Sequence, residues 1–224
     1  MGYRRTPFAQ GEWYHCYSRG VDKRTVFETP RDYERFLEAL YLSNSKRTDD
    51  RGTFQRLPHL EILQRGRQAP IVAIGAYCLM PNHFHLLMKE VAAGGITKFM
   101  HRVGTSYTMY FNAKRERIGN LFVKPFRSKH VDEDRYLKRV AQYIHLNPVE
   151  LFEPEWKTGT IAYSRGLQHK LENYRYSSLP DYQRNRIEKN ILDYGALELL
   201  KEDAEPLDML LSDAALYYAE LDHV

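Results

Sequence analysis

The chain has 224 residues, of which 43% are hydrophobic and 28% charged, with 33 Lys and Arg against 29 Asp and Glu. This length supports one domain with a full core, alone or with an appendage, and the composition is that of a soluble globular protein. No apolar run approaches the ~20 residues of a membrane span, and two cysteines are too few for a disulfide framework, so we expect a cytoplasmic protein that does not bind membranes.

Charge is distributed unevenly along the chain. From Arg186 onward there are three basic and ten acidic residues, which leaves 30 basic and 19 acidic residues in positions 1–185. A net charge of +11 on this part favours a polyanionic partner such as a nucleic acid, although ordinary solvation of a surface explains the excess equally well.

The first half of the chain predicts a strand, a helix and a hairpin. Residues 12–19 are rich in aromatic side chains and predict a strand that ends at Gly20. A helix is predicted after Thr29, with apolar side chains at helical spacing up to Tyr41. The apolar run 71–79 predicts a buried strand, and a short turn leads from it into a second strand over 83–89.

The second half predicts an amphipathic helix over 96–113, a basic strand over 121–131 and a helix over 134–147. Pro125 favours an edge position for the basic strand. Beyond Glu150 the pattern weakens to a loop-rich stretch, 151–183, and two acidic amphipathic helices, 187–201 and 206–221. The order of elements predicts an α+β protein, with helices packed on a small antiparallel sheet.

Two histidines stand one residue apart in the predicted strand 83–89. His83 and His85 therefore share a face, and two imidazoles on one rigid face are half of a metal site, although they equally fit structural hydrogen bonds. Tyr143 and Asn147 lie four residues apart on one face of the helix 134–147, where a phenol and an amide oxygen could complete such a site. Taken separately, Tyr143 also fits a core aromatic and Asn147 a helix end. His145 lies about 200° round that helix from Tyr143 and is not expected to join them.

Several strings of residues carry a family resemblance. The strings are Met80-Pro81-Asn82-His83-Phe84-His85-Leu86-Leu87, Leu121-Phe122 through Phe126-Arg127-Ser128, Tyr143-Ile144-His145-Leu146-Asn147-Pro148-Val149, and Tyr174-Arg175-Tyr176-Ser177-Ser178. In these strings the chain resembles single-tyrosine transposases of simple bacterial insertion sequences, and among them the REP-associated tyrosine transposases. After Val149 the chain departs from the family pattern, because a long segment intervenes before Tyr174.

The resemblance implies an HUH endonuclease with a ferredoxin-like sheet. Tyr143 would attack a DNA phosphodiester and form a covalent 5′-phosphotyrosine, while His83, His85 and Asn147 would hold Mg²⁺ or Mn²⁺. The substrate implied is single-stranded DNA that contains hairpins, such as REP-like elements. The enzyme would cleave this DNA and transfer the strand by transesterification, and it would reside at the nucleoid.

Basic side chains in the predicted loops and strands are candidate phosphate contacts. They are Arg4, Arg5, Arg19, Lys23, Arg24, Lys124, Arg127 and Lys129.

Two other functions compete with DNA cleavage. One is a domesticated binder of nucleic-acid hairpins with vestigial catalysis, and the other is a zinc hydrolase of a small substrate. The hydrolase would need an acidic base beside the histidines, but strand alternation places the nearest candidate, Glu90, on the face of Phe84. We expect a transposase domain over 1–150, a segment returning to the core over 151–185 and an acidic helical tail over 186–224, in a monomer or homodimer.

Overall fold

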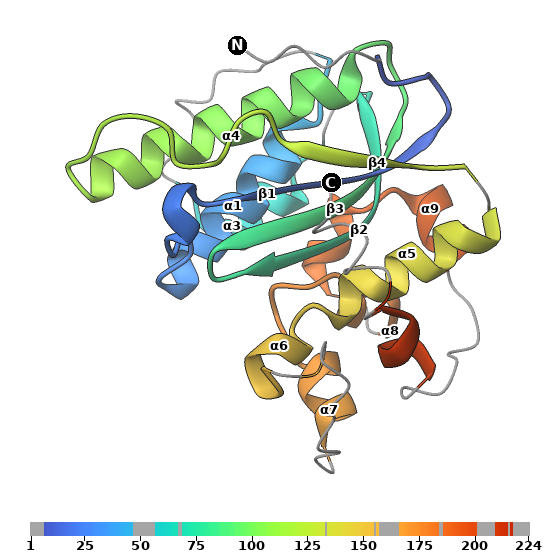
Figure 1. Ribbon diagram of the computed structural model, residues 1–224. Helices are drawn as coiled ribbons and strands as arrows, with labels where there is room; N and C mark the ends of the chain where they lie inside the picture. Colours follow the sequence, from blue (N-terminus) through green and yellow to red (C-terminus); the bar gives the residue numbers. More distant parts are fainter. Residues whose placement is uncertain are drawn as a thin grey trace.

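The computed structural model describes residues 7–46, 57–66, 69–132, 134–154, 156, 166–183, 186–200, 209–214 and 216. Within these residues, four strands form an antiparallel sheet that has helices on both faces (Figure 1). The strands are β1 (Trp13–Arg19), β2 (Val72–Met80), β3 (His83–Glu90) and β4 (Arg127–Val131). No helix in the described ranges is long and apolar enough to cross a membrane.

The strand order across the sheet is β2-β3-β1-β4. Along the chain the core elements are β1, α1 (Pro30–Ser43), β2, β3, α4 (Gly95–Lys114) and β4, with η1 (Val21–Lys23) and α3 (His59–Gln64) in the connections. The strands that follow a helix occupy the two outer positions, which is the ferredoxin-like βαββαβ arrangement. The predicted α+β class with an antiparallel sheet is therefore confirmed.

The predicted basic strand over 121–131 is shorter than expected, because β4 begins only at Arg127. Before it, Phe122 forms an isolated bridge with Gly20, and the amide of Val123 donates to the carbonyl of Arg19 at 2.9 Å. Pro125 has no N–H to continue this pairing, so the ladder is interrupted there. As Pro125 suggested, β4 lies at the edge of the sheet.

Aromatic side chains form the core between the sheet and the helices α1 and α4. The ring of Phe36 in α1 lies 4.8 Å from that of Phe84 in β3 and 5.1 Å from that of Tyr107 in α4, measured between ring centres. All three side chains are buried, and rings of this size dominate the energetics of a core. Because side chains alternate along a strand, burial of Phe84 on this face turns His83 and His85 to the other.

Helix α5 (Asp134–Leu146) covers the opposite face of the sheet, as Figure 1 shows. Its residues Val140 and Tyr143 belong to a second buried cluster that includes Cys78 of β2 and Leu87 of β3. The predicted loop-rich region after α5 contains short helices: α6 (Val149–Phe152), α7 (Leu167–Glu172) and α8 (Leu179–Gln183).

The segment that follows α7 covers the outer edge of β2. The amide of Leu79 donates to the carbonyl of Tyr176, and the amide of Ser178 donates to the carbonyl of Tyr77, both at 2.9 Å. The ring of Tyr176 stacks on that of Tyr33 in α1, with 3.8 Å between ring centres. An unpaired strand edge can pair with another chain, so this segment protects β2.

The first predicted acidic helix, 187–201, is divided into η3 (Ile187–Ile191) and α9 (Tyr194–Leu200). Leu192 is extended, and the carboxylate of Asp193 accepts from the amide of Ala196 at 3.0 Å. An aspartate that caps a helix start favours a new helix at that point, which explains the break. The amide of Asp193 also donates to the carbonyl of Ile74 at 2.9 Å, so this part of the tail docks against β2.

The second predicted acidic helix, 206–221, lies mostly outside the described residues. Residues 209–214 are helical. Leu210, Leu211 and Ala214 are buried in the same cluster as α5.

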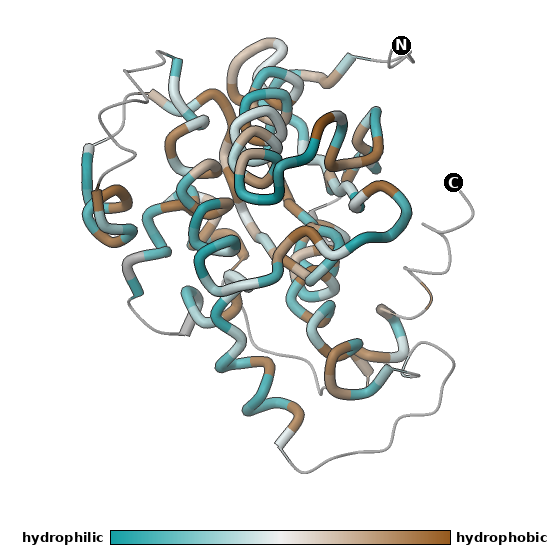
Figure 2. Tube along the Cα trace, turned by 90° about the vertical axis from the view of Figure 1, so that its left-hand side faces the viewer, coloured by the Kyte–Doolittle hydropathy of each residue, from teal (hydrophilic) through white to brown (hydrophobic). Residues whose placement is uncertain are grey.

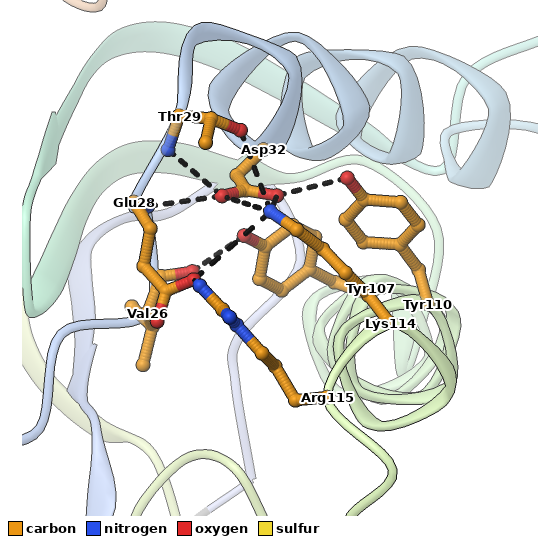
Figure 3. Close-up of polar contacts among 8 residues, drawn as sticks. All are labelled: Val26, Glu28, Thr29, Asp32, Tyr107, Tyr110, Lys114 and Arg115. Carbon is orange, nitrogen blue, oxygen red and sulfur yellow. Dashed lines mark hydrogen bonds and ion pairs between the residues drawn. The ribbon is translucent and has the colours of Figure 1, made fainter.

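A buried carboxylate joins the start of α1 to the end of α4 (Figure 3). Asp32 accepts hydrogen bonds from Lys114 Nζ at 2.7 and 2.9 Å, from Tyr110 Oη at 2.8 Å, and from the amides of Glu28 and Thr29 at 3.0 and 2.9 Å. Burial by itself raises the pKa of Asp32, but the hydrogen bonds from Lys114 and Tyr110 outweigh burial and hold the pKa below the ordinary value of 3.8.

We predict that Asp32→Asn lowers the free energy of unfolding by about 2 kcal/mol near pH 7, measured by urea denaturation. Because the folded pKa is depressed, the contribution of the carboxylate is complete above the unfolded value and is lost as the pH falls through the folded value. The difference between wild type and variant should therefore shrink below about pH 4. Glu61→Gln, which removes an exposed pair with Arg65, should change stability by less than about 0.5 kcal/mol. A constant difference down to low pH would contradict this role.

Candidate active site

His83 and His85 lie side by side on the face of β3 that α5 covers. Their rings are edge to face with 5.1 Å between centres, and their side chains are 8% and 6% exposed. In the register between β1 and β3, Arg19 lies opposite His83 and Tyr17 lies opposite His85. Directly opposed residues share a face of a sheet, so these four side chains lie on the same face at one end of the central strands.

The Nδ1 atom of each of these two histidines has a hydrogen-bond partner. Nδ1 of His83 lies 2.5 Å from Oδ1 of Asn82, and Nδ1 of His85 lies 2.8 Å from Nε2 of His15. An amide oxygen only accepts, so the hydrogen is on Nδ1 of His83 and the lone pair of the neutral ring is on Nε2. Metal-binding histidines commonly donate from one ring nitrogen to a neighbour while the other binds the ion.

His15 was not among the predicted site residues. It is fully buried in β1, opposite Lys129 of β4. Burial, with a smaller contribution from Lys129, lowers the pKa of His15 to about 3, so its ring is neutral at physiological pH. The alternation in 12–19 already places His15, Tyr17 and Arg19 on one face. What the sequence did not reveal is that this strand pairs with β3 so that the face is shared.

Tyr17 was also missed as a site residue. Its ring is stacked on that of His85, with 5.5 Å between centres and 16° between planes. It is only half-buried. Tyr17 is therefore a second phenol next to the histidine pair, and any assignment of a nucleophile has to be tested against it.

Tyr143 lies in α5, which contacts β2, β3 and β4, and Asn147 follows directly after the last residue of that helix. Tyr143 is 4% exposed and Asn147 is 2% exposed. The side-chain nitrogen of Asn147 donates to the carbonyls of Tyr143 and Ile144, at 3.2 and 3.0 Å. These bonds cap the last turn of α5. Because the side-chain nitrogen is the donor in both, Oδ1 is the atom of Asn147 that could bind a cation.

The described residues contain no group of three or more His, Cys, Asp or Glu side chains arranged to hold a metal ion. Among the described residues, the amide oxygen of Asn147 is a candidate third ligand for a cation bound by His83 and His85, and the substrate could supply further oxygen atoms. A mixed set of imidazole nitrogen and amide oxygen fits Mn²⁺ better than it fits Mg²⁺, which prefers oxygen alone.

Two further polar residues are turned away from the histidine pair. Nε2 of His145 lies 2.7 Å from Oγ of Ser178, in the segment that covers β2. Glu90 is buried and accepts from the amides of Gly95 and Ile96 at 3.1 and 2.7 Å, so it caps the start of α4. Glu90, the nearest acidic residue to the histidines in the sequence of β3, is therefore not available as the base that the hydrolase hypothesis needs.

Three connections meet at the end of the sheet where β1 ends, and we call this region the loop end. Main-chain hydrogen bonds join them: Gly20 N to Asn82 O at 2.8 Å, and Val21 N to Leu121 O at 2.9 Å. Gly20 has to be glycine, because a Cβ there would lie 2.5 Å from the carbonyl oxygen of Arg24. Figure 2 faces this end of the molecule, and much of the tube nearest the viewer is hydrophilic.

Four of the predicted DNA contacts gather at the loop end. The side chains of Arg19, Lys23 and Lys124 are exposed there, while Arg24 is half-buried and pairs with Asp22 at 3.0 Å.

The remaining predicted contacts are divided between β4 and the N-terminus. Arg127 and Lys129 lie opposite Tyr17 and His15 on the histidine face, and Lys129 Nζ lies 5.7 Å from the ring centre of Tyr136. Arg4 and Arg5 fall outside the described residues.

Comparison with known proteins finds a family match over the middle of the chain, from before β2 to the end of α5. Residues 56–147 match the sequence profile of the family described as "Transposase IS200 like". No curated protein matches the chain. A solved structure described as "Structure of the REP associates tyrosine transposase bound to a REP hairpin" is 14% identical, with a TM-score of 0.49, and the alignment covers 92% of this chain and 100% of that one. The resemblance of residues 56–147 to the transposases of simple insertion sequences is thus confirmed, and the matched region contains His83, His85, Tyr143 and Asn147.

Proposed function

We propose that this protein is a metal-dependent enzyme that cleaves single-stranded hairpin DNA and transfers the cut strand through a covalent bond to Tyr143. One observation carries the proposal: the paired histidines of β3 lie on the sheet face that is covered by the helix that bears Tyr143 and that Asn147 directly follows. The sequence match over the same elements supports a DNA-cleaving activity of this class.

In the first step, Oη of Tyr143 attacks a phosphorus of the DNA backbone. The bond from phosphorus to the 3′ oxygen breaks, the 3′ end leaves as a hydroxyl, and the 5′ phosphate stays on Tyr143. A 3′ hydroxyl of another strand then attacks this phosphotyrosine and releases the phenol. The number of phosphoester bonds is unchanged, so the transfer needs no ATP.

The protein would supply charge and orientation for this reaction. His83, His85 and Asn147 would hold Mn²⁺ or Mg²⁺, and the bound ion would neutralise negative charge that develops on the phosphate. Arg19 lies opposite His83 in the sheet and is exposed, and its guanidinium would contact a phosphate near the one attacked. The phenol proton of Tyr143 has to pass to water or to a nearby base, because an unperturbed tyrosine has a pKa of about 10.

The basic residues of the loop end would bind the DNA backbone. Arg19, Lys23 and Lys124 are exposed on connections held together by main-chain hydrogen bonds, so a phosphate chain would meet a preformed surface. The surface adjoins His83, because Gly20 is bonded to Asn82.

A second candidate function is hairpin binding without cleavage. The observation in its favour is the burial of Tyr143 and Asn147, since a nucleophile that is 4% exposed needs α5 to shift before DNA can reach it. Tight binding without any covalent product would support this second function.

We predict that Tyr143→Phe abolishes covalent attachment to a labelled hairpin oligonucleotide in the presence of Mn²⁺, because the phenylalanine lacks the attacking oxygen. The affinity for the oligonucleotide should remain within about threefold, since this change removes no basic group. Attachment is measured by denaturing gel and affinity by fluorescence anisotropy.

The matched control is Tyr17→Phe, which removes the phenol stacked on His85. It should leave covalent attachment in place. Attachment that persists in Tyr143→Phe and disappears in Tyr17→Phe would reassign the nucleophile.

We further predict that Arg19→Ala and Lys124→Ala each make the DNA-binding constant less dependent on salt, because each removes one phosphate contact. In a plot of the logarithm of the binding constant against the logarithm of the salt concentration, the magnitude of the slope should fall by about 1 for each variant. Lys98→Ala is the control, since Lys98 is exposed near the start of α4, at the other end of the sheet. Equal slopes for all three variants and the wild type would show that the DNA does not bind at the loop end.

A further inference from the structure

We propose that His15 is a positioning residue that fixes the ring of His85 for metal binding. This inference rests on the proposed function, in which His85 is a metal ligand. Nε2 of His15 lies 2.8 Å from Nδ1 of His85, and both side chains are buried. When His15 accepts this hydrogen, the lone pair of His85 is assigned to Nε2, the atom that would bind the ion.

His15 is held in place by its position in the sheet. It lies in the central strand β1, opposite Leu87 on one side and Lys129 on the other. Its ring is 5.0 Å from that of His85, with 29° between the planes. Tyr17, the residue directly opposite His85, stacks on the same imidazole at 5.5 Å. The ring of His85 is thus fixed by a hydrogen bond that it donates to one residue of β1 and by stacking on another.

His83 has an equivalent arrangement from a different element. Its Nδ1 donates to Oδ1 of Asn82 in the turn between β2 and β3. Both histidines are therefore held through Nδ1, which leaves Nε2 as the ligating atom in each ring. Two rings that present the same nitrogen can converge on one ion, whereas a ring with the opposite tautomer presents a hydrogen to it.

The sequence match does not contain this residue. The family signature covers 56–147, and β1 lies before it. The role of His15 follows from the pairing of β1 with β3, which brings residues 15 and 85 together across 70 positions of the chain.

The first test needs no metal. In metal-free protein, ¹⁵N spectra of the imidazoles report which nitrogen of His85 carries the hydrogen, and we expect Nδ1–H in the wild type. His15→Leu removes the acceptor at similar volume and should shift His85 toward Nε2–H, while His15→Gln offers an amide oxygen and should restore Nδ1–H. His130→Leu, a change at an exposed histidine of β4, should leave the His85 signals unchanged. An unchanged His85 tautomer in His15→Leu would overturn the proposal.

The second test measures Mn²⁺ affinity by calorimetry. His15→Leu should weaken binding by about 10- to 100-fold, the usual effect of removing a hydrogen-bond partner of a ligand, and His15→Gln should recover most of the loss. Equal affinity in wild type and His15→Leu would overturn the proposal. If His15→Leu fails to fold, as judged by its amide spectrum, the comparison between His15→Gln and wild type decides in the same way: a tautomer or affinity far from the wild type contradicts the proposal.

The two tests separate this inference from the proposed function. Absence of Mn²⁺ binding in the wild type would refute the metal-dependent function, whereas the tautomer measurement would still show whether His15 orients His85.

Discussion

The alternation of side chains along β3, between an aromatic core and the face under α5, determines where His83 and His85 lie. Phe84 and Leu86 are buried in the aromatic core beneath α1 and α4, so His83 and His85 have to face α5. A shift of one residue in the pairing of β3 would bury the histidines among aromatic rings and expose Phe84, at a cost of several kcal/mol. The packing of the hydrophobic core therefore determines which side chains of β3 form the polar face.

The polar face is then ordered by residues from three other elements. His15 and Tyr17 of β1 contact His85, Asn82 of the β2–β3 turn contacts His83, and Asn147 ties its own side chain to the last turn of α5. The loop end adjoins this face and carries the exposed Arg19, Lys23 and Lys124. The proposed site for phosphodiester chemistry and the proposed surface for a polyanion thus adjoin at one end of the sheet.

Much of this arrangement was predictable from local patterns. The hairpin of β2 and β3 and the helices α1, α4 and α5 follow from apolar spacing and turn residues, and the strand period put His83 and His85 together while it separated Glu90. His15 could not be assigned because its role depends on the register between strands distant in sequence. The break at Leu192 was missed because the capping role of Asp193 was not recognised in a helix-like pattern.

The most direct test of the account is to identify the residue that carries DNA after the reaction. The protein is incubated with Mn²⁺ and a single-stranded hairpin oligonucleotide, digested with protease and nuclease, and examined by tandem mass spectrometry. We predict a nucleotide linked through a 5′ phosphate to Tyr143. A nucleotide on Tyr17, or tight binding without any linked peptide, would contradict it.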